Sequence, residues 1–147
     1  MHEEIVAVTP EVEDDENEAI EVVTPATYYL KNGKHYIVYE EVVEGTSGVI
    51  KNRIKINGDE CVEIVKSGLS NSHMIFEKNK KNQTFYKTPY GQMLIGVNTR
   101  HLQVDFEEDK IAVQIDYELD VNHEPMADCK IRMNIVSKDS GKFSVLS

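Results

Sequence analysis

The sequence predicts an all-β fold: a single antiparallel, up-and-down β-barrel of about eight to ten strands, with little or no helix. Turn signals interrupt the chain about every ten to fifteen residues, and the stretches between them are short and rich in Val, Ile, Tyr and Thr. No stretch shows an apolar stripe of helical period with a capping residue at both ends. A barrel is favoured over an open sandwich because closure removes the exposed edges of so large a sheet.

The turn signals are of several kinds. Asn32-Gly33 and Asn57-Gly58 predict type I′ hairpins, because both central residues of that turn need a positive φ, which Asn tolerates and Gly adopts freely. Thr88-Pro89-Tyr90-Gly91 fits a type I turn with Pro at its second position, so we expect the flanking strands to pair. Further breaks are expected at 45–48, 68–71, 79–82 and 122–125.

A strand is predicted for each stretch between these breaks. The clearest runs from Ile111 to Leu119, where large apolar or aromatic side chains alternate with Ala, Gln, Asp and Glu. This alternation predicts one face in the core and the other in water, and Ala127–Val136 repeats it. The other strands are expected at Ile5–Thr9, Ile20–Leu30, His35–Val43, Val49–Ile56, Glu60–Lys66, Ser72–Glu77, Thr84–Lys87 and Gln92–Val104.

Three places are expected to be irregular. Gln92–Val104 is too long to stay straight beside shorter neighbours, and Gly96 in its middle predicts a bend or bulge that lets the sheet curl. Pro25 lacks a backbone donor, so its strand is expected to be interrupted or at an edge there. The acidic segment from Glu11 to Glu18 is expected to be a loop, because clustered like charges repel one another and resist burial.

The chain is expected to form one domain, 1–147, because its length and its 40% hydrophobic content suffice for a core without disulfide or metal. We expect an N-terminal strand and acidic loop (1–19), a barrel body (20–136) and a C-terminal tail (137–147). The acidic start is unlike a secretory signal and no apolar run could span a membrane, so a cytoplasmic location is expected. The net charge of -10 disfavours nucleic acid and anionic membranes as partners.

Several short motifs follow one another between Ile20 and Val136. Tyr86-Lys87-Thr88-Pro89-Tyr90-Gly91 is the most specific, and the others are Tyr36 to Glu41, Ile54 to Ile56, Lys66 to Gly68, Met74 to Glu77, Thr99, and Tyr117 to Leu119. Together they resemble the YwiB-like family of bacterial proteins, a domain of unknown function. The resemblance implies a calycin-like (lipocalin-like) barrel and no established activity. Where the family pattern has Arg, this chain has Lys66, which cannot form a bidentate clamp on a carboxylate.

Polar side chains inside the barrel are the candidate ligand contacts. Adjacent strand residues point to opposite faces, so one of Glu40 and Glu41 faces inward. A buried carboxylate needs a partner. The basic candidates are Arg53, Lys55, Lys66, Arg100 and Arg132. Such a pair is either a hook for a ligand head group or an internal or rim ion pair. The candidate ligand-binding residues are Tyr39, Glu40, Lys66, Arg100 and Tyr117.

No catalytic residue, metal site or cofactor is predicted. The histidines lie on different segments with no two at metal-ligand spacing, and the two cysteines form no C-x-x-C pair. In a reducing compartment Cys61 and Cys129 are expected to be buried free thiols. The chain also lacks a nucleophile elbow, a phosphate loop and a dinucleotide fingerprint.

These observations favour a cytoplasmic barrel that binds a small, partly apolar molecule in its lumen or at its mouth. The alternative is a barrel filled by its own side chains that acts as a protein-interaction or dimerisation module, for example as a homodimer. An enzyme is the third hypothesis and the least favoured. The core is expected to contain Met74, Phe76, Phe85, Met93, Ile115, Tyr117 and Met133.

Overall fold

The computed structural model describes residues 3–13, 24–69, 71–88 and 90–137, which contain ten strands and no helix. The strands are β1 (Glu3–Glu13), β2 (Thr24–Lys31), β3 (Lys34–Val42), β4 (Val49–Asn57), β5 (Cys61–Gly68), β6 (Ser72–Glu77), β7 (Lys81–Thr88), β8 (Gly91–Phe106), β9 (Lys110–Val121) and β10 (Glu124–Ser137). Each predicted strand is therefore present. Within the described residues no helix is long and apolar enough to cross a membrane.

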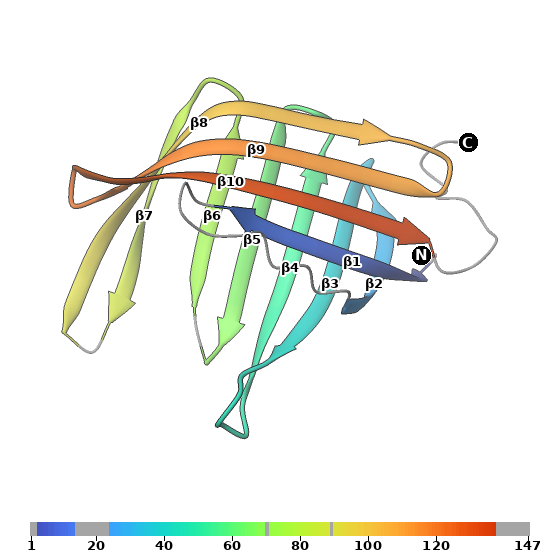
Figure 1. Ribbon diagram of the computed structural model, residues 1–147, viewed down its shortest axis with the longest axis horizontal. Helices are drawn as coiled ribbons and strands as arrows, with labels where there is room; N and C mark the ends of the chain where they lie inside the picture. Colours follow the sequence, from blue (N-terminus) through green and yellow to red (C-terminus); the bar gives the residue numbers. More distant parts are fainter. Residues whose placement is uncertain (1–2, 14–23, 70, 89, 138–147) are drawn as a thin grey trace.

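All ten strands form one antiparallel sheet in the order β6-β5-β4-β3-β2-β1-β10-β9-β8-β7. In Figure 1 strands β1, β8, β9 and β10 cross over β2 to β6 at a steep angle, so the curled sheet encloses a core between two layers. The end strands β6 and β7 contact each other and are joined by a turn in which Lys80 N donates to Glu77 O at 3.0 Å. No ladder pairs them. We call this unpaired join of the barrel the seam.

Strand β1 lies between β2 and β10 in the sheet, and it is longer than expected. The predicted loop is wrong at Glu11 and Glu13, because β1 continues through both. The register sets Glu11 opposite Arg132 and Glu13 opposite Lys130. Opposite charges at directly facing positions favour strand pairing, which a count of like charges along the chain misses. The remainder of the acidic segment and residues 20–23 lie outside the described residues.

Of the two Asn-Gly turns predicted to be type I′, one has that conformation and the other does not. Asn32 and Gly33 have φ values of 52° and 75°, as a type I′ turn requires. Asn122 and His123 make the same kind of turn between β9 and β10, with φ values of 50° and 70°. In the Asn57-Gly58 turn only Gly58 has a positive φ, so the type I′ prediction is wrong for this turn. Strands β7 and β8 pair as predicted, although Pro89 between them is outside the described residues.

The irregularity in β8 lies at Arg100 and not at Gly96. The β8–β9 register shifts between Thr99 and His101, which leaves Arg100 and His101 both exposed. A bulge of this kind bends the strand, so β8 can pair with β7 at one end and β9 along the other. The predicted bulge is thus present, but it lies at Arg100 and not at Gly96, the glycine that suggested it.

Gly96 has a different role, as a place of close approach on the outer face of the sheet. A Cβ atom there would lie 3.1 Å from Lys81 Cε and 3.2 Å from Asp120 Cβ. Lys81 of β7 and Asp120 of β9 form an ion pair across this position. Because glycine has no side chain, the ion pair between Lys81 and Asp120 can lie across β8 at this position.

Pro25 lies where β2 lacks one of its two neighbours. Pairing of β2 with β3 begins only at Thr27 and Val38, whereas residues 24–26 pair with β1 alone. The strand continues through Pro25, so it is not interrupted, but it has an edge there as predicted. The reason is that proline has no backbone N–H to donate to β3.

Of the seven residues predicted for the core, four are buried, two are half-buried and one is exposed. Phe76, Ile115, Tyr117 and Met133 are buried, and Met74 and Met93 are half-buried. Phe85 is wrong, because its side chain is 68% exposed. It alternates with the inward residues of β7 and therefore faces water. Cys61 and Cys129 are free thiols, but both are only half-buried, whereas the sequence predicted buried ones.

Candidate ligand site at the seam

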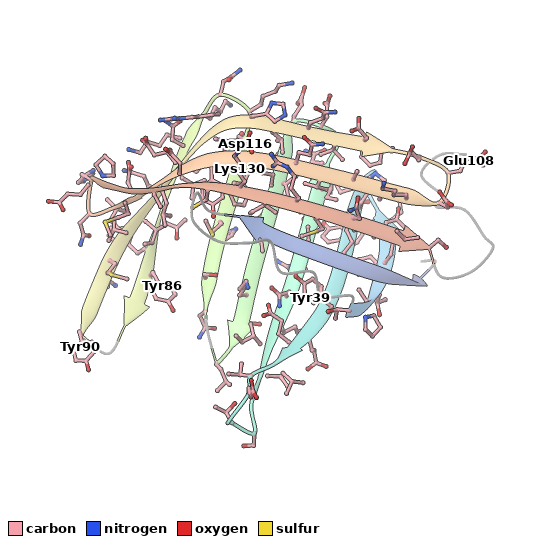
Figure 2. All side chains as sticks on the ribbon, in the orientation of Figure 1. Tyr39, Tyr86, Tyr90, Glu108, Asp116 and Lys130 are labelled. Atoms are coloured by element: carbon pink, nitrogen blue, oxygen red, sulfur yellow. The ribbon has the colours of Figure 1, made fainter. Side chains whose placement is uncertain are left out.

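An open cavity of about 270 Å³, which we call the seam cavity, lies at the seam. Strands β6, β7, β8 and β9 supply its lining, which is mostly apolar and aromatic: Ser72, His73, Met74, Thr84, Tyr86, Met93, Ile95, Tyr117 and Leu119. Figure 2 shows Tyr86 between β7 and β6, on the line where the two strands fail to pair. No ladder draws β6 and β7 together, and the cavity lies between inward side chains of these two strands, β8 and β9.

Tyr117 forms a firm wall of this cavity. Its ring packs edge-on against Phe76, with centroids 4.9 Å apart and planes at 62°. Burial raises the pKa of the Tyr117 phenol well above its ordinary value, and the neighbouring Cys129 thiol adds to the shift. The phenol is therefore neutral at physiological pH, and the cavity wall carries no charge at this point.

Strands β3, β4 and β5 carry a group of inward polar side chains that we call the inner polar cluster: Tyr39, Glu41, Asn52 and Lys66. Glu41 Oε1 accepts hydrogen bonds from Asn52 Nδ2 at 2.6 Å and from Lys66 Nζ at 3.1 Å. The register places Tyr39, Asn52, Lys66 and Ser72 opposite one another on β3, β4, β5 and β6. Since Ser72 lines the cavity, this row leads from the cluster to the seam.

Burial differs sharply within the cluster. Asn52 is wholly buried, and its Oδ1 has no hydrogen-bond partner. The side chains of Lys66 and Glu41 are 37% and 41% exposed. Burial, and then the charge of Glu41, raise the pKa of Tyr39 to about 12. The cluster thus combines a compensated ion pair near water with two neutral polar groups beneath it.

Three of the five residues proposed from the sequence face the interior, and two do not. Tyr39 and Lys66 belong to the inner polar cluster, and Tyr117 lines the seam cavity. Glu40 is exposed on the outer face, and Arg100 pairs there with Glu118 at 2.7 Å and Asp128 at 3.7 Å. The carboxylate that faces inward is that of Glu41, which lies two positions after Tyr39 and therefore on the same face of β3.

Two other hollows include these proposed residues. Where β2 separates from β3, an open hollow of about 600 Å³ is lined by Thr24, Pro25, Ala26, Thr27, Val38, Tyr39, Glu40 and Lys51. A third, of about 170 Å³, is lined by Arg100, Asp116, Tyr117, Asp128, Cys129 and Lys130. Both are bordered by exposed charged side chains of the outer face, whereas the seam cavity has a lining suited to an apolar molecule.

Asn52 is the member of the cluster that sequence reasoning missed. Strand β4 places Ile54 and Ile56 inward, and Asn52 continues the same parity. A polar residue at an inward position of an alternating strand was the available signal. No group of three or more His, Cys, Asp or Glu residues that could hold a metal ion occurs in the described part of the chain.

Comparisons with known proteins agree with this architecture. A family model described as a domain of unknown function (DUF1934) matches residues 5–133. The chain is 32% identical over 114 residues to the uncharacterized beta-barrel protein YwiB of Bacillus subtilis (strain 168), covering 77% of this chain and 78% of that protein. It also resembles the crystal structure of the ywiB protein from Bacillus subtilis, with a TM-score of 0.73 and 23% identity over 93% of this chain and 94% of the other. The resemblance inferred from the motifs is confirmed.

Proposed function

The chain belongs to the DUF1934 family of β-barrel domains, whose function is unknown, and we propose that this member binds a small, partly apolar molecule in the seam cavity. The cavity itself carries the proposal. Its lining is mostly apolar and aromatic, and a concave apolar surface left open to water is typical of a binding site. Ligand pockets start at about 300 Å³, which limits the occupant to a small molecule.

The inner polar cluster supports the same proposal, because ligand sites combine an apolar wall with a few fixed polar groups. Glu41, Asn52 and Lys66 are held by hydrogen bonds at the end of a row that reaches the cavity. The free thiols Cys61 and Cys129 suit a reducing compartment, so a cytoplasmic location belongs to the proposal.

Native mass spectrometry of protein purified gently from cells tests this function. We expect a discrete adduct that disappears on denaturation. Thr84→Trp fills the cavity from β7 and should abolish the adduct, whereas Gln83→Trp adds the same ring to the outer face of the same strand and should retain it. The neutral fluorescent probe phenylnaphthylamine should bind with the same variant dependence. A bare wild-type chain that also fails to bind the probe would contradict the proposal.

A barrel that acts as a dimerisation module is the second candidate, because one end of the barrel exposes apolar side chains. Val42, Val49 and Leu69 are exposed where the β3–β4 hairpin and the β5–β6 connection meet, at the lower end of the barrel in Figure 1. Leu69 lies against Gly48, where a Cβ atom would approach it to 2.7 Å. Analytical ultracentrifugation decides this candidate: a dimer that Leu69→Lys dissociates supports it, and a monomer at all concentrations excludes it.

A further inference from the structure

From the unused acceptor of Asn52 we infer that the inner polar cluster recognises a neutral hydrogen-bond donor on the ligand, a hydroxyl, in preference to a carboxylate. The inference rests on the proposed function and adds to it the chemistry of the ligand's polar end. It depends on three observations: the orientation of the Asn52 amide, the state of the charges around it, and its position relative to the cavity.

The orientation of the Asn52 amide follows from its partner. Nδ2 donates to Glu41 Oε1 at 2.6 Å, and the reverse orientation would set the amide oxygen against a carboxylate oxygen. Oδ1 therefore points away from Glu41, and no hydrogen bond reaches it although the residue is wholly buried. A buried carbonyl oxygen without a donor is unfavourable, so a donor brought by a ligand gains free energy there.

The charges of the cluster disfavour an anion. The ammonium of Lys66 already pairs with Glu41 at 3.1 Å, so a carboxylate ligand would have to compete with Glu41 for it while approaching a like charge. Tyr39 keeps its proton because burial and Glu41 raise its pKa to about 12. A neutral hydroxyl meets neither obstacle, and the oxygens of Glu41 and Asn52 are both acceptors.

The register places Asn52 within reach of a ligand in the seam. Asn52 lies opposite Lys66, which lies opposite Ser72 on the cavity wall. Two strand spacings separate Asn52 from that wall, or about 10 Å. Lys66 lies between Asn52 and Ser72 in this row, and its long, partly exposed side chain can shift towards water while Glu41 keeps its hydrogen bond to Asn52. An apolar body in the seam can therefore present its polar end to Asn52.

Two isomers of equal size separate a donor from its absence. Octanol carries a hydroxyl donor, and heptyl methyl ether has the same atoms without one. Competition with phenylnaphthylamine should show octanol binding the wild type about fivefold or more tightly than the ether, as one additional hydrogen bond provides. In Asn52→Leu the ratio should fall to one or below. Asn134→Leu, at a half-buried asparagine on the outer face of β10, should keep the wild-type ratio.

The outcomes separate this inference from the proposed function. Equal binding of both isomers to the wild type, or a preference for octanol that survives in Asn52→Leu, overturns the inference and leaves the cavity standing. A wild type that does not bind phenylnaphthylamine overturns the proposed function and the inference together. If circular dichroism shows that Asn52→Leu does not fold, octanoate replaces the variant: octanoate that binds the wild type as tightly as octanol overturns the inference.

Discussion

Strands β9 and β10, which we call the β9–β10 wall, and the strands at the seam, β6 and β7, show the same alternation of inward and outward side chains. The inward side chains are closely packed in the wall, whereas at the seam they leave a cavity. In the wall an antiparallel ladder runs from Val121 to Lys110, and Ile111 and Ile115 are wholly buried. At the seam Met74, on an equally regular strand, is only half-buried and lines a cavity. Alternation thus specifies a face, whereas the ladder to the next strand decides whether that face is packed closely or leaves space.

Truncating one residue in each region should show the contrast most strongly. Ile115→Ala should lower the free energy of unfolding by about 3–4 kcal/mol, because it leaves a void in a fully packed wall. Met74→Ala should cost less than about 2 kcal/mol, since its side chain already borders a cavity. Urea denaturation measures both. Equal losses would mean that the seam is packed as tightly as the wall.

Breaking the bridge between the two regions should have the next largest effect. Lys81 of β7 pairs with Asp120 of β9, whose side chain is 7% exposed, so the pair ties an edge of the seam to the wall. Lys81→Met should destabilise the protein by about 2 kcal/mol by leaving a buried carboxylate unpaired. Adding Asp120→Asn should recover most of that loss in a double-mutant cycle. Additive effects of the two substitutions would contradict the bridge.

The buried side chain of His35 on β3 should make the stability of the protein depend on pH. Burial lowers the pKa of His35 from its ordinary 6.5, and its Nδ1 lies 2.8 Å from the Tyr28 hydroxyl. The unfolded chain therefore binds more protons below pH 6.5, so stability is complete above that pH and falls as the pH drops towards the folded pKa. His35→Leu should flatten this slope in urea titrations at several pH values. His101→Gln, at an exposed site, should leave it unchanged, and a slope that persists in His35→Leu would exclude the assignment.

The smallest effect is expected at the partly exposed ion pair of Glu41 and Lys66. Glu41→Gln removes the second cause of the raised Tyr39 pKa, so that pKa should fall slightly from about 12 while burial keeps it above its ordinary value. Stability should change by less than about 1 kcal/mol, because the ion pair with Lys66 is partly solvated. Ultraviolet titration of tyrosinate measures the shift. Glu40→Gln on the outer face is the matched control, and an equal shift in both variants would place the wrong carboxylate inside.

Particular residues show where sequence reasoning reached its limit at the site. Tyr39, Lys66 and Tyr117 are inside as proposed, but Glu40 is outside because the strand from Tyr36 to Val43 carries apolar residues on both faces. Such a strand does not reveal its own parity, and an error of one position exchanges the two carboxylates. Arg100 is outside because it lies at a bulge, after which β8 exchanges its inward and outward positions. No glycine in the sequence marks the position of this bulge.

The sequence by itself determined the ten strands, most of their turns and the all-β class, because alternation and turn chemistry act over a few neighbouring residues. It also determined family membership through the order of its motifs. Only the tertiary structure decided that β1 joins β2 to β10, that β6 and β7 meet without a ladder, and that Asn52 is buried with a free oxygen. Each of these depends on which distant strands pair and in which register, and that is set by the packing of the whole sheet.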